Sequence, residues 1–310
     1  MSIELSYILE RLSRDAPGFV AECESEYARK VAVAASDIAE SLVTSPIVLL
    51  SGPSGSGKTT TAKKLREELN IKGIRAHTVS LDDYFLSPSL AGAPKTPEGD
   101  HDFESPACID WALLGEHFTA LQSRRGIELP HFSFAAQTRS NKVTPLKLGR
   151  DEIAIFEGIH ALSDRITGAH PEAYRLYISA RSSITDGGAV FFKGTWARLV
   201  RRVIRDEMFR ASDANFTLAL WANVRRGEKA HISPFRDTAR LKLDTLLPYE
   251  LAAVKSAARA VFERARPGIE RYDEVREILR AYERVPDFDT ALVPKNSILR
   301  EFLSGSSYEY

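Results

Sequence analysis

Apolar and polar residues follow two different periods along this chain. Several runs of four to six residues, most of the runs rich in apolar residues, have the length and composition of strands in a parallel sheet. The predicted strands cover residues 47–50, 75–80, 152–157, 174–179 and 260–263. Elsewhere, apolar side chains recur at helical spacing. The predicted helices cover residues 62–69, 109–121, 197–209 and 269–285. Strands that alternate with helices predict an α/β fold with a parallel sheet of about five strands.

The first 45 residues are predicted to be helical. Apolar residues share one helical face from Leu5 to Leu12, and Pro17-Gly18 then breaks the pattern. A second, alanine-rich helix is expected over residues 19–43. Because no catalytic group of residues occurs here, we expect this part to cover the core. A docking or oligomerisation element is the alternative, which leaves a homo-oligomer open.

Two irregular segments interrupt the regular pattern. Residues 86–100 are rich in Pro, Gly and Ser and are predicted to form a mobile loop. Residues 127–139 carry Phe132 and Phe134 at strand spacing and are predicted to form a hairpin arm, whose rings either stack on a flat substrate or pack. The chain is expected to divide into an N-terminal helical segment, a core, and a C-terminal helix with a tail: residues 1–45, 46–268 and 269–310.

Composition narrows the class of protein. The 310 residues are 44% hydrophobic and 27% charged, as in ordinary globular domains. Lys plus Arg equals Asp plus Glu at 42 each, so no overall charge favours nucleic acid or an acidic membrane. Cys23 and Cys108 lie far apart and indicate neither a disulfide framework nor zinc. Without a membrane-length apolar run or a signal-peptide pattern, we expect a cytoplasmic protein with no nucleic-acid or membrane partner.

The strongest chemical signal follows the first predicted strand. Gly52 and Gly57-Lys58-Thr59 have the G-x-x-x-x-G-K-[ST] spacing of a phosphate-binding P-loop. Glycines allow the backbone to curl so that its N–H groups form a nest for phosphate oxygens. Lys58 would reach the β- and γ-phosphates, and the Thr59 hydroxyl would hold Mg²⁺. The predicted nucleotide-binding residues are Gly52, Ser54, Gly55, Ser56, Gly57, Lys58, Thr59 and Thr60. A Gly/Ser-rich surface turn is the alternative.

Acidic residues follow two other predicted strands. Asp82 and Asp83 come after residues 75–80, and Glu157 ends residues 152–157. Ligands of open α/β sheets bind beyond the carboxyl ends of strands, so one aspartate is a candidate general base or water-mediated Mg²⁺ ligand. The other would have a structural role, such as capping a turn. Glu157 is a candidate for organising Mg²⁺.

One predicted helix carries an arginine-rich face. Its four arginines lie within one arc at 100° per residue: Arg198, Arg201, Arg202 and Arg205. Guanidinium groups without an acid among them repel each other unless a polyanion lies between them. We therefore expect phosphate contact, with a solvated surface as the alternative.

Taken in order, these segments resemble the phosphoribulokinase/uridine kinase family. The resemblance rests on GPSGSGKTT (52–60), SLDDYF (80–85), DFESPACID (102–110), LPHFSF (129–134), IFEGIHAL (155–162) and RLVRRVIRDEMFR (198–210). Later pieces, LPYEL (247–251) and SILREFLSGSSYEY (297–310), resemble a bacterial uridine kinase-like subgroup. The family resemblance implies a three-layer P-loop fold with a hairpin arm and a helical lid. The implied reaction transfers the γ-phosphoryl group of ATP, with Mg²⁺, to the 5′-OH of a nucleoside.

The resemblance also implies roles for single residues. Asp82 matches the catalytic aspartate, and Glu157 the acidic Mg²⁺ position. The implied substrate-binding residues are Asp82, Phe103, Glu104, Phe132, Gln137, Arg205 and Arg210, with Lys58, Arg202 and Arg205 assisting catalysis. Phe132 and Gln137 stand where uridine–cytidine kinases carry a Tyr and a His. The alternatives are a kinase of another small hydroxylated metabolite, such as a sugar phosphate or a pantothenate-like acceptor, and a nucleotide-binding ATPase module.

Overall fold

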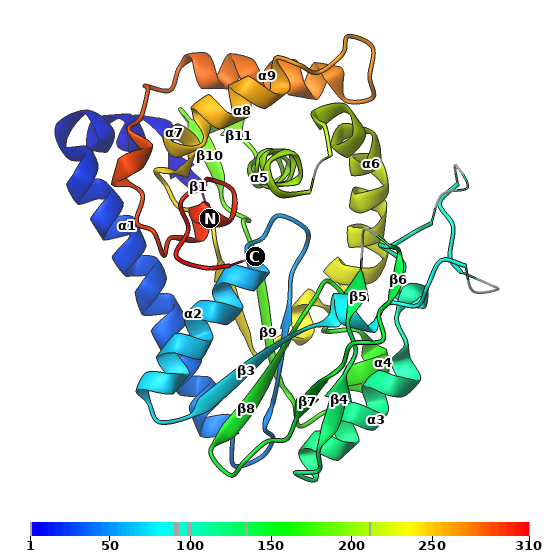
Figure 1. Cartoon of the computed structure of the whole chain (residues 1–310). Helices are drawn as coiled ribbons and strands as arrows, with labels where there is room; N and C mark the ends of the chain where they lie inside the picture. Colours follow the sequence, from blue (N-terminus) through cyan, green and yellow to red (C-terminus); the bar gives the residue numbers. More distant parts are fainter. Residues whose placement is uncertain are drawn as a thin grey trace.

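The computed structural model describes residues 2–89, 93–97, 99, 101–133, 136–210 and 212–309. Within this described part, a five-stranded sheet forms the centre of the molecule, in the order β12-β9-β2-β8-β3 (Figure 1). Every neighbouring pair is parallel. The strands are β2 (Ile47–Ser51), β3 (Arg75–Ser80), β8 (Glu152–Glu157), β9 (Tyr174–Ser179) and β12 (Leu241–Asp244). The predicted parallel sheet is therefore confirmed.

One of the predicted strands is wrong. Residues 260–263 lie at the end of helix α8 (Lys255–Phe262), and the fifth strand is β12 instead. Ala258, Val261 and Phe262 are buried at helical spacing, while Arg259 and Glu263 pair one turn apart on the exposed side. A short apolar run alone does not show whether a segment is a strand or a buried turn of helix. Here the helical spacing of the buried and the charged residues fits the helix.

Helices cover both faces of the sheet. Val48 and Leu50 of β2 belong to a core shared with α1 (Leu5–Ser41) and α2 (Lys58–Ile71). Ile47 and Leu49 face the opposite core, which α3 (Trp111–Gln122) and α4 (Asp164–Thr167) complete. Because consecutive side chains of a strand point to opposite faces, β2 is buried at every position. The predicted three-layer P-loop fold is confirmed.

The long N-terminal helix has its break before Pro17. Asp15 has non-helical dihedrals (φ −159°, ψ 80°), and its Oδ1 accepts a hydrogen bond from the Gly18 N–H at 3.0 Å. Asp15 thus caps the second part of the helix, with Pro17 in its first turn, where a missing N–H costs least.

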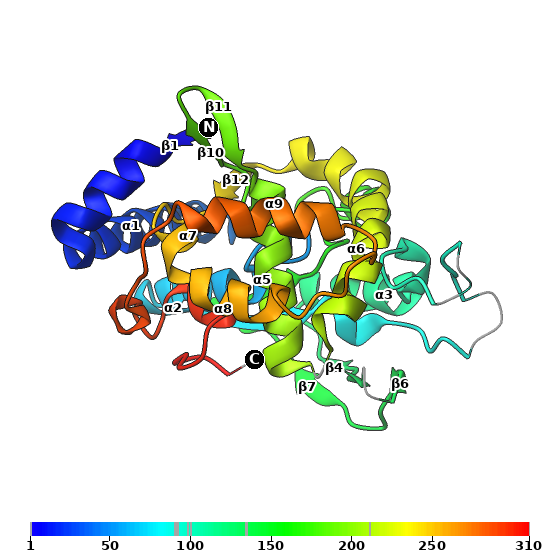
Figure 2. The same ribbon diagram turned by 90° about the horizontal axis from the view of Figure 1, so that it is seen from above.

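In Figure 1 the remaining helices lie above the sheet, on the side of the carboxyl ends of its strands. Helix α5 runs between α6 and α8, and α9 lies over them (Figure 1, Figure 2). Their bounds are α5 (Gly194–Phe209), α6 (Ala214–Gly227), α7 (Glu250–Ala253) and α9 (Tyr272–Glu283). A small sheet that the sequence did not predict joins β1 (Ser2–Glu4), β10 (Ser183–Asp186) and β11 (Ala189–Phe192). In the described part of the chain, no helix has both the length and the apolar composition that crossing a membrane requires.

The predicted hairpin arm consists of two short antiparallel ladders. Strand β4 (Ile127–Leu129) pairs with β7 (Thr144–Leu146), and β5 (Phe132–Ser133) pairs with β6 (Thr138–Arg139). Phe134 of the arm lies outside the described residues, as do residues 90–92, 98 and 100 of the predicted loop.

Candidate active site

The loop between β2 and α2 needs glycine for its shape. Gly55 and Gly57 have φ angles of 73° and 82°, which side chains rarely allow. A Cβ atom at Gly52 would lie 2.2 Å from the carbonyl oxygen of Ile178, and one at Gly55 would lie 2.6 Å from that of Arg198. The loop is thus packed against β9 and α5, and its curl is fixed by the surrounding backbone.

Three consecutive carbonyl groups of the loop are held from outside. Arg198 Nη1 donates to Ser54 O at 3.3 Å, and Arg201 Nη1 donates to Gly55 O at 3.2 Å. The Thr245 hydroxyl donates to the Ser56 oxygen at 2.8 Å. The C=O and N–H of one peptide unit point in opposite directions. Because these three carbonyl groups point out of the loop, the N–H groups of the same peptide units point into its concave side. That is the arrangement of an anion-binding nest.

The arginine face of α5 has acidic partners, so the prediction of unpaired arginines is wrong. Arg198 Nη2 lies 3.0 Å from the carboxylate of Glu228, and Arg201 makes two hydrogen bonds of 2.5 and 2.6 Å with Glu250. Both arginines are buried. Their partners come from segments 30 and 49 residues further along the chain, which helical spacing alone does not detect. Arg198 and Arg201 therefore brace the loop rather than face phosphate.

The other arginines surround Asp206, one turn along the same helix. Arg202 Nε lies 3.3 Å from Asp206, and Arg205 donates to Asp206 Oδ1 at 3.1 Å. Arg202 Nη1 also donates to the Ser54 hydroxyl at 3.0 Å, which brings it to the P-loop. Arg210 lies 3.8 Å from Asp206 with its side chain 55% exposed, and the nearby charge of Arg205 lowers its pKa. Arg202, Arg205 and Arg210 thus form one cationic group beside the loop.

Lys58 lies among carboxylates. Its Nζ donates to Pro53 O at 3.3 Å. Burial lowers the pKa of Lys58, while Glu157, Asp82 and Glu301 oppose this by favouring the charged amine. Burial also raises the pKa of Glu157 to about 7, against the charge of Lys58. The lysine that would reach phosphate is therefore balanced by carboxylates from three different segments.

The predicted metal-binding oxygens lie together. The Thr59 hydroxyl donates to Glu157 Oε1 at 3.0 Å. Among the residues that the structure describes, no group of three or more His, Cys, Asp and Glu side chains could hold a metal ion. Mg²⁺ in a nucleotide site needs fewer, because it takes one or two protein oxygens together with phosphates and waters. The Thr59–Glu157 pair fits that donor set.

The two adjacent aspartates have different surroundings. Both lie in a single 3₁₀ turn (Leu81–Tyr84) that follows β3. Asp83 Oδ1 accepts the backbone N–H of Phe132 at 3.1 Å and so ties the arm to the end of the strand. Burial raises the pKa of Asp82, and the charges of Lys58, Arg210 and Arg205 oppose this. The charges of Lys58, Arg205 and Arg210 thus act on Asp82, whereas the Asp83 carboxylate is bonded to the arm.

Aromatic rings line the side of the site next to the arm. The Phe103 ring centroid lies 5.6 Å from that of Phe85 and 6.4 Å from that of Phe132. Phe132 is buried, so its ring packs against these neighbours. Gln137 is exposed at the turn between β5 and β6, with a φ of 51°. The structure thus groups Phe103 with Phe132 and leaves Gln137 in solvent.

Buried polar atoms without partners occur beside these rings. Glu104 Oε1 lies 3.6 Å from Arg202 Nη1, and its Oε2 has no hydrogen-bond partner among the described residues. Both ring nitrogens of the buried His160 lack a partner with good hydrogen-bond geometry there, and the Glu104 backbone lies near enough only to act on the His160 pKa. Burial raises the pKa of Glu104 and lowers that of His160 to about 3. Buried polar atoms normally have partners, so Glu104 and His160 offer capacity for a polar ligand. Sequence reasoning missed His160, although it belongs to the quoted segment IFEGIHAL (155–162).

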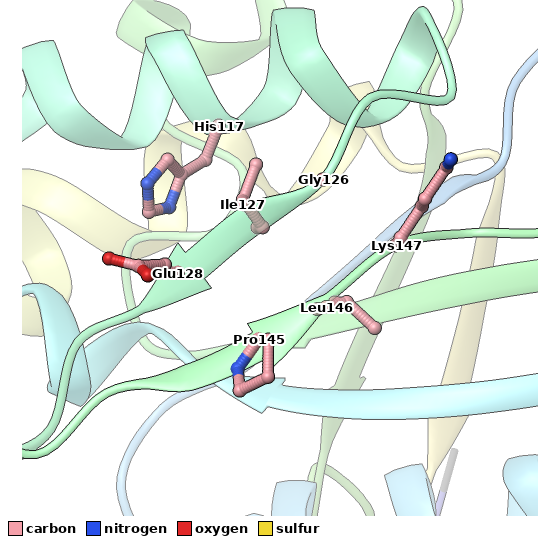
Figure 3. A pocket seen from close by; sticks show the side chains of 7 residues that line it. All are labelled: His117, Gly126, Ile127, Glu128, Pro145, Leu146 and Lys147. Carbon is pink, nitrogen blue, oxygen red and sulfur yellow. The ribbon is translucent and has the colours of Figure 1, made fainter.

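A separate hollow lies away from the P-loop. Its volume is about 580 Å³, and it is bounded by α3 and the β4–β7 ladder (Figure 3). Its titratable side chains are those of His117, Glu128 and Lys147: the Nδ1 of His117 is already bonded to the Tyr84 hydroxyl at 2.8 Å, and Glu128 and Lys147 are exposed. This hollow therefore shows no chemistry comparable to that around Lys58.

Comparison with known proteins agrees with this geometry. Residues 47–180 match the model of the Phosphoribulokinase / Uridine kinase family. The predicted family resemblance is confirmed. The matched residues include the P-loop, Asp82, Glu104 and Glu157, whereas the α5 arginines and the C-terminal segment lie beyond them.

Similar curated proteins are named uridine kinase. The one from Schizosaccharomyces pombe is 36% identical over 115 residues, which are 37% of this chain and 24% of that protein. The one from Halobacterium salinarum is 26% identical over 53% of this chain and 64% of its own length. The one from Deinococcus deserti is 25% identical over 66% of this chain and 87% of its own length. The chain thus spans less than two thirds of the first two relatives.

Proposed function

We propose that this chain is an ATP-dependent kinase that transfers the γ-phosphoryl group to a hydroxyl of a small molecule. The observation that carries the proposal is the position of Lys58: it follows a braced P-loop and acts electrostatically on both Glu157 and Asp82. Phosphoryl transfer depends on positioning and charge neutralisation, and these groups supply both. The family match and the relatives named uridine kinase support the same reaction.

Each residue then has a task. The loop N–H groups and Lys58 bind the phosphates, and Arg202, Arg205 and Arg210 add positive charge where negative charge develops. Asp82 orients the acceptor hydroxyl and takes its proton. Mg²⁺, held by Thr59 and Glu157, would neutralise charge on the phosphates when bound.

The acceptor site favours a hydroxylated molecule with a flat or apolar part. Glu104 and His160 have unused hydrogen-bonding capacity, which suits sugar hydroxyls. The Phe103 side of the site is apolar and suits a ring. A nucleoside with a free 5′-OH combines both features, and it is the acceptor that we propose.

A screen for acceptor-dependent ADP tests this function. Purified protein with MgATP is incubated with nucleosides, phosphorylated sugars and pantothenate, and ADP is measured with and without each acceptor. We expect ADP only when a nucleoside is present, with a phosphorylated product detectable by mass spectrometry. ADP formation that does not depend on any acceptor would instead indicate an ATPase module.

A further inference from the structure

The C-terminal segment, residues 297–309, packs on the P-loop although it lies far from it in sequence. In Figure 1 it passes beside the start of α2. A Cβ atom at Gly57 would lie 2.3 Å from Ile298 Cδ1, so Ile298 covers the last glycine of the loop. The Thr60 hydroxyl donates to Glu301 Oε2 at 2.7 Å. Ile298 is fully buried and Glu301 is 5% exposed.

Several anchors fix this segment. The Cζ atom of the Arg201 guanidinium lies 5.2 Å from the centroid of the Phe302 ring, and Arg201 itself braces the P-loop. Arg300 Nη2 donates to the carbonyl oxygen of Val293 at 2.6 Å. The Tyr308 hydroxyl donates to Glu67 of α2 at 2.8 Å. These contacts anchor the C-terminal segment against Arg201 and α2, so that Ile298 and Glu301 stay next to the P-loop.

The charge of Glu301 is directed at the phosphate-binding groups. Its Oε1 lies 3.9 Å from Arg205 Nη1, and its charge also acts on Lys58 and Glu157. A buried carboxylate is costly unless charged and hydrogen-bonding groups surround it, and an apolar side chain would pack at less cost. A carboxylate in this place is therefore explained by what it does to its neighbours.

We propose that Glu301 is a positioning residue of the phosphate site. The Arg205 guanidinium lies between Asp206 of its own helix and Glu301 of the C-terminal segment. Glu301 thus draws Arg205 toward the P-loop and, through Thr60, fixes the first turn of α2. This role rests on the proposed function, because it concerns how the site holds nucleotide phosphates.

Nucleotide binding tests the proposal without an acceptor. Isothermal titration of the full chain with the magnesium complex of AMP-PNP gives the dissociation constant, and melting temperatures without ligand are measured in parallel. Glu301→Gln keeps the size and an accepting oxygen but loses the charge, and should weaken binding by about tenfold. Glu301→Asp, which keeps the charge, should recover part of the affinity. Glu309→Gln, an exposed acid of the same segment, is the matched control and should bind like the wild type.

A double-mutant cycle shows whether Glu301 acts through Arg205. In an Arg205→Gln background, Glu301→Gln should add little, since the residue it positions is gone. Equal or tighter binding by Glu301→Gln, or full additivity with Arg205→Gln, would overturn the positioning role and leave the proposed function intact. A lower melting temperature with unchanged affinity would do the same. If the wild type does not bind the nucleotide, the proposed function fails, and this inference fails with it.

Discussion

Asp82 and Asp83 share one turn but have different surroundings. Asp83 accepts the Phe132 N–H, and burial raises the pKa of Asp82 against the opposing charges of Lys58, Arg210 and Arg205. Neighbouring residues cannot direct their side chains the same way, so we expect one carboxylate to face the site while the other holds the arm. The Asp83–Phe132 hydrogen bond fits the structural role, and the catalytic role of Asp82, which the family resemblance implies, stays a prediction.

Replacing each aspartate by asparagine should separate these roles. Asp82→Asn removes the base and should lower kcat by at least ~10²-fold, with little change in ATP affinity. Asp83→Asn should cost much less activity. Steady-state kinetics of both variants is the measurement; exchanged behaviour would place the base at Asp83, and no effect in either would contradict the mechanism.

His160 should make stability depend on pH. Burial is the main cause that lowers its pKa to about 3, the charges of His231 and Lys58 act in the same direction, and the Glu104 backbone opposes them. Between that value and the ordinary histidine pKa of about 6.5, the unfolded chain binds more protons than the folded one, so stability falls as pH falls. His160→Gln should therefore lose less stability than the wild type between pH 6.5 and 4. Parallel acid dependence of both melting temperatures would contradict this.

At the scale of elements, two consecutive arginines of helix α5 have different roles: one supports the P-loop from behind, and the other belongs to the cationic group beside it. Arg201 is buried against Glu250, whereas Arg202 contacts Ser54 and Asp206 near the loop surface. Periodicity predicted the helix and its arginine face, and this part is confirmed. It could not reveal Glu228 and Glu250, because those partners depend on how distant segments pack. The prediction of a strand at 260–263 was wrong for a similar reason: an apolar run of this length can form a strand or a helical turn, and its packing against distant segments determines which one forms.

Arg201 and Arg202 form a matched pair for testing this division. Arg201→Met leaves the Glu250 carboxylate buried without its partner and should cost about 3–5 kcal/mol of folding free energy. Arg202→Met should change the melting temperature much less and weaken the use of ATP or acceptor more. Chemical denaturation and steady-state kinetics of both variants measure this. A sharp loss of stability with normal kinetics for Arg202→Met would make that residue structural as well.

At the scale of the whole molecule, the site draws on segments that are far apart in the sequence, from Gly52 to Glu301. The P-loop, the Asp82-Asp83 pair and Glu157 could be named from the sequence because each lies at or just after the carboxyl end of a strand, and the family resemblance then chose Asp82. Glu301 lies in the C-terminal segment, whose sequence resembles that of bacterial uridine kinase-like proteins. No local sequence pattern connects it with Thr60, 241 residues earlier. Its placement depends on the packing of the C-terminal segment, which sequence spacing does not encode.

Selectivity for the acceptor base should be loose. Phe132 is buried among aromatic rings and Gln137 is exposed, so an apolar wall replaces two hydrogen-bonding groups. Such walls discriminate by roughly 10–200-fold, far less than sites that hydrogen-bond their ligand. Ratios of kcat/KM for uridine against purine nucleosides and sugars measure this. A preference for uridine of ~10⁴ would show that a polar reader of the base exists elsewhere.

The central claim is that the P-loop around Lys58 drives phosphoryl transfer to an acceptor. The most direct measurement is acceptor-dependent ADP formation by the wild type, by Lys58→Ala and by Lys72→Ala, an exposed lysine at the end of the same helix. Removing the cation that neutralises the β- and γ-phosphates should lower kcat of Lys58→Ala by at least ~10²-fold while the protein stays folded. Lys72→Ala should match the wild type. Unchanged turnover in a folded Lys58→Ala protein would contradict the account.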